Sequence, residues 1–120
     1  MSLANGLASA VAQAIAGAGH PLSIPELVSV RTLTGNDTLT NQSRVCQRLD
    51  PGGANRDVTL PAAEHGLVYF VVNAADAAEN LVIKNAAAAT IATANQNEAA
   101  IVWSDGTSWY LVCLFTAPIA

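Results

Sequence analysis

Short apolar runs with polar residues between them fill the chain from residue 27 onward. Val58 and Leu60, and then Leu67, Tyr69 and Val71, follow the two-residue period of a β-strand that buries one face. The same kind of pattern predicts strands over residues 27–33, 38–40, 43–49, 57–60, 67–73, 80–84, 90–93, 99–103 and 109–115. We therefore expect eight or nine short strands with no helix between them.

Turn-forming residues separate these runs. Asp50-Pro51-Gly52-Gly53 offers a proline for the first corner of a turn and glycines where a positive φ is needed. Asp105-Gly106 predicts a hairpin that brings Trp103 and Trp109 face to face. Short strands at near-regular spacing indicate an all-β domain over residues 26–120, folded as an antiparallel β-sandwich or a jelly-roll-like barrel.

The first 25 residues have a different pattern. Apolar residues recur there every four positions and predict a short helix over residues 3–17 with a narrow apolar stripe: Leu3, Leu7, Val11 and Ile15. Because so short a helix is marginal in water, we expect residues 1–25 to form a helical or extended arm and linker that orders against a partner. An ordinary packed helix or a frayed end is the alternative. Residues 7–19, interrupted by polar side chains and preceded by no positive one, predict neither a signal peptide nor a membrane span.

Charge is sparse along the whole chain. Charged residues make up 12% of the sequence, against about 25% in a typical domain, which indicates either a surface partly covered by another subunit or a surface of small residues. Alanine dominates the apolar share and tolerates exposure, so both interpretations stay open. The net charge is −4 and the five basic residues are scattered. Nucleic-acid binding, which needs clustered Lys and Arg, is therefore not expected.

Reactive side chains form no pattern typical of a catalyst. His20 and His65 each lie beside a turn former, without a second imidazole or a cysteine at ligand spacing. Asp50 and Asp76 belong to different turns, where a carboxylate usually accepts bonds from its own backbone instead of binding calcium. We therefore expect a protein that is not an enzyme, with no catalytic, cofactor-binding or metal site.

Two cysteines and three late aromatic residues complete the candidates. Cys46 and Cys113 are expected to be buried, unlinked thiols of a protein made in a reducing cytoplasm, with a disulfide as the alternative. The aromatic residues Trp103, Trp109 and Tyr110 are expected to close the core or a subunit interface. The other interpretation is an exposed platform on which sugar rings stack.

The segment 49–61, which starts with Leu49-Asp50-Pro51-Gly52-Gly53, resembles a recurrent pattern in small virion proteins of tailed bacteriophages. Segments 81–85, 96–100 and 103–109 continue the resemblance, which covers residues 43–112. The family occurs as capsid decoration (cement) proteins and as modules of tail or fibre proteins, and it implies an oligomeric, β-rich structural role with no catalytic residues.

A free-standing chain with no long repetitive shaft fits capsid decoration better than a fibre. The resemblance thus implies a homotrimer on the virion's capsid surface, made in the host cytoplasm. Its partners are the major capsid protein and other copies of itself, with no nucleic acid and no membrane. A receptor- or glycan-binding tip of a tail appendage is the alternative.

Overall fold

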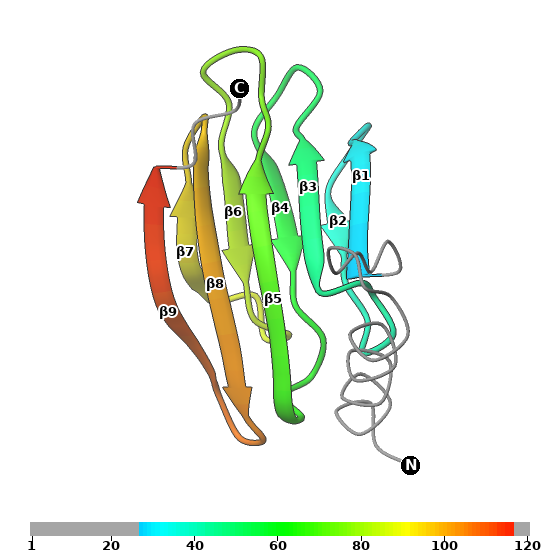
Figure 1. The fold of residues 1–120 in the computed structure, drawn as a ribbon, viewed down its shortest axis with the longest axis vertical. Helices are drawn as coiled ribbons and strands as arrows, with labels where there is room; N and C mark the ends of the chain where they lie inside the picture. Colours follow the sequence, from blue (N-terminus) through cyan, green and yellow to red (C-terminus); the bar gives the residue numbers. More distant parts are fainter. Residues whose placement is uncertain (1–26, 117–120) are drawn as a thin grey trace, which may run out of the picture.

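The computed structural model describes residues 27–116, which form nine β-strands joined by turns and short loops (Figure 1). The strands are β1 (Val28–Thr32), β2 (Asp37–Thr38), β3 (Cys46–Asp50), β4 (Arg56–Thr59), β5 (His65–Asn73), β6 (Leu81–Lys84), β7 (Thr90–Ala94), β8 (Glu98–Asp105) and β9 (Trp109–Thr116). Each lies where the alternating pattern predicts a strand, with bounds that differ by a few residues. The predicted all-β class is confirmed. The predicted arm of residues 1–25 lies outside the described residues.

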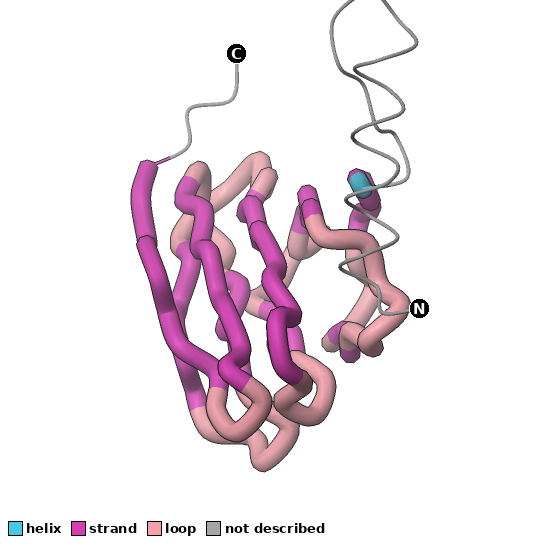
Figure 2. The backbone as a smooth tube through the Cα atoms, turned by 60° about the horizontal axis from the view of Figure 1, so that its bottom comes forward, coloured by secondary structure: helices cyan, strands magenta, loops and turns pink. Residues whose placement is uncertain are grey.

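The strands form two facing sheets. Sheet A has five strands in the order β1-β3-β5-β8-β9, and sheet B has four in the order β2-β4-β6-β7. Sheet A lies in front of sheet B in Figure 1, and Figure 2 brings forward the loops at the lower end of both sheets. The arrangement is a two-layer sandwich.

The chain winds between the two layers. From β1 to β6, successive strands belong alternately to sheet A and sheet B. Each strand from β3 to β6 pairs in parallel with the strand two places before it in the chain. This path is that of a short, two-sided β-helix. β7, β8 and β9 then pair in antiparallel fashion with β6, β5 and β8 and finish the two sheets.

The prediction of an antiparallel sandwich or a jelly-roll-like barrel is therefore wrong in its strand directions. Four of the strand pairs between residues 27 and 116 are parallel and three are antiparallel, and both sheets have free edges instead of closing. Parallel neighbours need a crossover connection, which is usually a helix. Here a strand of the opposite sheet makes the crossover, so the absence of helices does not imply antiparallel pairing.

Apolar side chains fill the space between the sheets. The residues predicted to face inward on β4 and β5 are buried, and they pack with residues of β3, β6, β7 and β8: Leu49, Val58, Leu60, Leu67, Tyr69, Val71, Leu81, Ile83, Ala94 and Val102. A fully buried side chain of this kind stabilises the fold by roughly 1.5 to 3 kcal/mol. This core joins the inner faces of the two sheets and leaves their other faces pointing outward.

A buried asparagine fixes the upper loops. Asn73 is fully buried at the end of β5, and its Nδ2 donates to the carbonyl oxygens of Glu79 (2.8 Å) and Ala94 (2.9 Å). Its Oδ1 accepts a bond from the N–H of Ala75 over 2.9 Å. The β5–β6 loop is thereby tied to itself and to the end of β7.

Candidate interaction surface

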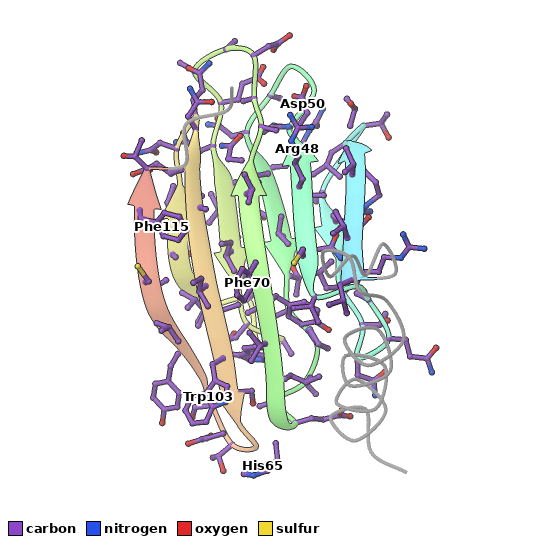
Figure 3. The ribbon with its side chains drawn as sticks, in the orientation of Figure 1. Arg48, Asp50, His65, Phe70, Trp103 and Phe115 are labelled. Carbon is purple, nitrogen blue, oxygen red and sulfur yellow. The ribbon has the colours of Figure 1, made fainter. Side chains whose placement is uncertain are left out.

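The outer face of sheet A is lined with apolar side chains. Because alternate residues of a strand point to opposite faces, the buried residues of β5 and β8 leave their neighbours pointing outward. Register places four of these outward residues in one row across β3, β5, β8 and β9: Cys46, Phe70, Ile101 and Cys113. Phe70 is 41% exposed and lies at mid-height in Figure 3, between Trp103 near the lower end and Phe115 near the upper end. We call this surface the outer face of sheet A.

The opposite surface has a different chemistry. On the outer face of sheet B, Lys84 Nζ lies 3.0 Å from the carboxylate of Asp57, and Thr59 and Thr93 alternate with buried neighbours. Such a face is suited to water, whereas exposed aromatic residues like those of sheet A are typical of surfaces that bind a partner. The asymmetry between the two faces is the main functional observation.

Trp103 and Tyr110 form the lower part of the outer face. They pair directly across β8 and β9, their ring centroids are 5.8 Å apart, and they are 38% and 47% exposed. The hydroxyl of Tyr110 donates to Oδ2 of Asp105 over 3.3 Å. Two of the three aromatic residues singled out from the sequence thus form an exposed stacked pair.

Trp109 lies on the other side of the sheet. It pairs with Ser104, points into the core and is buried against Tyr69. The predicted face-to-face meeting of Trp103 and Trp109 is therefore wrong. The turn closes between Asp105 N–H and Ser108 C=O (3.3 Å), and this register places Tyr110 opposite Trp103.

The predicted Asp105-Gly106 turn itself is confirmed. Gly106 has a φ of 99°, and Oδ1 of Asp105 accepts bonds from the N–H groups of Ser108 and Thr107, each 2.9 Å long. These bonds, that from Ser108 first, hold the pKa of the Asp105 carboxyl below its ordinary value. The ionised side chain therefore stabilises the turn that presents the aromatic pair.

β9 is an edge strand of sheet A, and none of the other described strands covers it. Every residue after Trp109 in this strand is exposed, including Leu111 and Leu114, which point toward the inner side. A bulge leaves Val112 without a partner in β8, and its side chain is 61% exposed. No residue from Trp109 to Thr116 carries a charge. A long, apolar, uncharged edge strand is a ready site for pairing with another chain.

The cysteines lie at opposite ends of the central row. Cys46 is half-buried and Cys113 is exposed, so the prediction of two buried thiols is wrong for Cys113. Both are free, and with three strand spacings between them they are about 14 Å apart. Burial raises the pKa of the Cys46 thiol. An intramolecular disulfide cannot span this distance.

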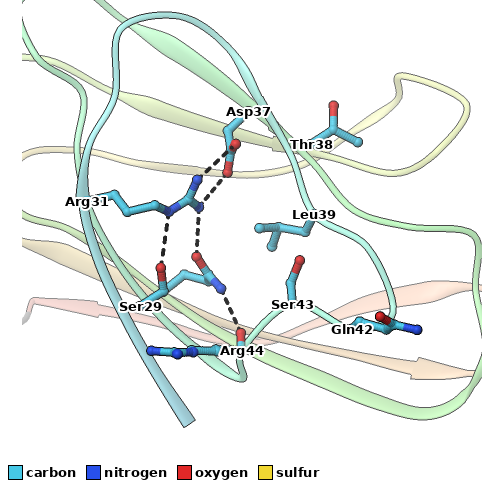
Figure 4. A pocket seen from close by; sticks show the side chains of 9 residues that line it. Ser29, Arg31, Asp37, Thr38, Leu39, Gln42, Ser43 and Arg44 are labelled. Atoms are coloured by element: carbon cyan, nitrogen blue, oxygen red, sulfur yellow. Dashed lines mark hydrogen bonds and ion pairs between the residues drawn. The ribbon is translucent and has the colours of Figure 1, made fainter. Parts of the chain in front are cut away.

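A polar hollow of about 230 Å³ opens between the sheets beside β1 and β2 (Figure 4). Arg31 makes a bidentate ion pair with Asp37 (2.6 and 3.1 Å) and also donates to Oε1 of Gln47 (2.9 Å). The hydrogen bonds to Asp37 raise the pKa of Arg31. Because these groups bind one another, the cluster joins the two sheets at their open side instead of offering free groups to a ligand.

Within residues 27–116, the remaining candidates do not assemble into a reaction centre. The exposed His65 ring has its Nδ1 3.1 Å from the carbonyl oxygen of Asp105, and His20 lies outside the described residues. Asp50 and Asp76, interpreted from sequence as unrelated turn residues, are brought together with Glu79. Sequence spacing gave no sign of that cluster, because parallel pairing of β3 with β5 creates it.

Leu3, Leu7, Val11 and Ile15, the proposed arm contacts, also lie outside the described residues. None of the protein-family models, curated proteins or solved structures compared with the chain matches it. Within residues 27–116, no helix has the length and apolar character needed to cross a membrane.

Proposed function

We propose that this protein is a structural virion protein that binds the outer surface of a tailed-bacteriophage capsid and stabilises it as a homotrimer. The observation that carries the proposal is the contrast between the two outer faces: sheet A exposes Phe70, Trp103, Tyr110 and Phe115, whereas the outer face of sheet B presents threonines, an ion pair and the half-buried Val82. In the proposal a neighbouring copy covers sheet A and β9. The virion role itself rests on the sequence resemblance over residues 43–112.

The proposed role is not enzymatic. Two of the described side-chain clusters make structural contacts: Arg31 binds Asp37, and Asp105 binds the backbone of its own turn. Decoration proteins gain strength from repetition, because many copies share modest contact energy over a shell. In the proposal residues 1–25 bind the major capsid protein through Leu3, Leu7, Val11 and Ile15.

Self-association is the first test. Light scattering after size exclusion should give the mass of a trimer, and V112K should shift the mass toward the monomer because it puts a charge on the apolar edge. V82K, the same substitution on the outer face of sheet B, is the matched control and should stay trimeric. A wild-type chain that remains monomeric as its concentration rises contradicts the proposed assembly.

Capsid binding is the second test. Full-length protein and a variant lacking residues 1–19 are added to undecorated particles, and bound copies are counted after sedimentation. We expect the truncated variant to stay folded and oligomeric, as judged by circular dichroism and light scattering, but to bind severalfold more weakly. Equal occupancy by both proteins excludes the arm as the anchor.

A second function is favoured by the stacked pair itself. Trp103 and Tyr110 present exposed rings beside the carboxylate of Asp105, a combination that suits sugar binding, so the alternative is a receptor- or glycan-binding tip of a tail appendage. Titration with a glycan panel distinguishes the two, because W103A should abolish binding only in the second case. Copy number separates them independently: many copies over the shell, or a few at the tail.

A further inference from the structure

Three carboxylates meet at the upper end of the sandwich. Asp50 is the last residue of β3, and Asp76 and Glu79 belong to the loop that connects β5 to β6. One oxygen of each side chain lies within 4.8 Å of the others. β3 and β5 are parallel neighbours, with Leu49 opposite Asn73, so their C-terminal ends lie side by side at the upper end of sheet A (Figure 1). The winding of the chain thus places three negative charges together.

The buried, unpartnered carboxylate oxygen of Glu79 is the observation that indicates a ligand at this cluster. The residue is only 9% exposed, and its Oε1 is fully buried without a hydrogen-bond partner among the described residues. A buried carboxylate oxygen that receives no donor is costly. The ion pairs found within residues 27–116 join Arg31 to Asp37 and Lys84 to Asp57, so neither neutralises this cluster.

Arg48 is the nearest basic residue along β3, two positions before Asp50 and on the same face of the strand. Figure 3 shows both side chains at the upper end of β3, yet Arg48 is exposed and makes no ion pair with the described acidic residues. Arg56, at the start of β4, also lies beside the cluster, because its N–H donates to the carbonyl oxygen of Asn80 and its Nε donates to that of Pro51, each over 2.9 Å. It makes no ion pair with the three carboxylates, so the described basic residues leave the cluster without a bound positive partner.

The cluster is held in place by other bonds. Asn73 fixes the loop through its bond to the Glu79 carbonyl oxygen, and Gln96 Nε2 donates to the carbonyl oxygen of Ala75 over 3.2 Å. Oδ1 of Asp50 accepts from the N–H of Gly52 over 2.9 Å, which leaves Oδ2 available. The carboxylates are thus positioned by the fold before any ligand arrives.

We propose that Asp50, Asp76 and Glu79 bind a divalent cation of the calcium class. Calcium takes six to eight oxygen ligands at about 2.3 to 2.6 Å, so oxygens that share one ion lie at most about 5 Å apart, and the observed spacing satisfies this limit. Water and backbone carbonyls complete the shell. The cation links the end of β3 to the β5–β6 loop. This site does not depend on the proposed virion role.

Calorimetry on the full chain, freed of metal with EDTA, tests the proposal. Calcium chloride should bind at one ion per chain and raise the melting temperature by about 4 to 8 °C at saturating concentration. Magnesium chloride should bind more weakly, because magnesium demands a tighter octahedral site. E79Q should weaken calcium binding roughly tenfold or more, and D76N, a change at an exposed residue that leaves the core intact, should weaken it as well.

A matched control variant and a measurement without metal make the test specific. E64Q removes an exposed carboxylate outside the cluster and should bind calcium like the wild type. In EDTA, E79Q should melt at the same temperature as the wild type or higher, because it removes a buried unpaired charge. Three outcomes overturn the proposal: no calcium binding by the wild type, equal binding by E79Q and E64Q, or an E79Q variant that is less stable than the wild type in EDTA. The last outcome would assign Glu79 to a partner within the protein, such as Arg56 or Arg48.

Discussion

The rings of Trp109 and Tyr69 lie with their centroids 5.8 Å apart inside the sandwich, and each ring keeps its polar atom bonded to a loop carbonyl. Trp109 Nε1 donates to the carbonyl oxygen of Pro61 (2.8 Å), and the Tyr69 hydroxyl donates to that of Thr40 (2.6 Å). Both acceptors lie just beyond strands of sheet B. The two rings therefore fasten sheet A to sheet B by apolar contact and by hydrogen bonds at once.

We expect Y69F to lower the free energy of unfolding by about 0.5 to 1.5 kcal/mol, because it removes one of the two bonds to the Thr40 carbonyl oxygen, which keeps the bond from the N–H of Ser43. W109A should cost about 3 to 5 kcal/mol, since it removes a large core ring. Urea denaturation followed by circular dichroism measures both. Y110F alters an exposed hydroxyl and should stay within about 0.5 kcal/mol of the wild type. A loss in Y110F as large as that in Y69F contradicts this account of the core.

N73A should be among the most destabilising polar substitutions. The substitution removes the donor to the carbonyl oxygens of Glu79 and Ala94 and the acceptor for the N–H of Ala75. We expect it to lower the free energy of unfolding, measured by urea titration, by roughly 2 to 5 kcal/mol. N41A is the control, because Asn41 is exposed and bonds only the side chain of Glu64. Similar costs for N73A and N41A would show that the buried bonds do not fix the upper loops.

Three glycines give a graded test of the β-turns. A Cβ added at Gly52 would lie 2.2 Å from the carbonyl oxygen of Leu33, in a residue with φ of 74°, so G52A combines backbone strain with a collision. G53A meets only the strain of a positive φ, about 1 kcal/mol, and G35A meets neither. Thermal melts should rank the losses in the order G52A, G53A, G35A. Any other order is inconsistent with the described turn.

The pKa of Asp105 predicts a pH dependence. Because the folded state lowers this pKa, the carboxylate stabilises the turn at neutral pH, and the contribution is lost as the pH falls below about 4 and passes through the lowered value. Melting temperatures recorded from about pH 7 to about pH 2.5 should therefore fall more steeply for the wild type than for D105N. E64Q provides the comparison for a general loss of one carboxylate. Parallel curves for the wild type and D105N would exclude a role for this group.

Sequence alone predicted the strands well but not their partners. Period-two alternation marks strands such as β5, where Leu67, Tyr69 and Val71 are buried as expected, because burial of one face is a local property. The pairing of strands depends on which strand each loop connects to. A short loop can return the chain to the same sheet as a hairpin or lead it across to the facing sheet. The sequence separation between paired residues also differs from one pair of parallel strands to the next. Val28 of β1 pairs with Cys46 of β3, but Cys46 pairs with Phe70 of β5, which is farther along the chain. An irregular offset leaves no repeat to detect.

The candidate surface was only partly predictable for the same reason. Trp103 and Tyr110 were recognised as interface or core residues, and the structure places them outside, because the turn register at Asp105 and Ser108 decides which face each ring takes. Phe70 and the exposed edge of β9 were not recognised. Their exposure follows from the sheet order, in which β9 is an edge and sheet B does not cover it.

The bare edge of β9 also matters during synthesis. This strand follows all the other described strands along the chain, so it leaves the ribosome after them and joins a sheet whose other four strands are already available. While β9 is unpaired on its outer side, it presents an uncharged apolar strand to other copies made nearby. In the proposed assembly, pairing of β9 with a neighbouring copy competes with aggregation at the same edge, so faster assembly would leave less protein to aggregate.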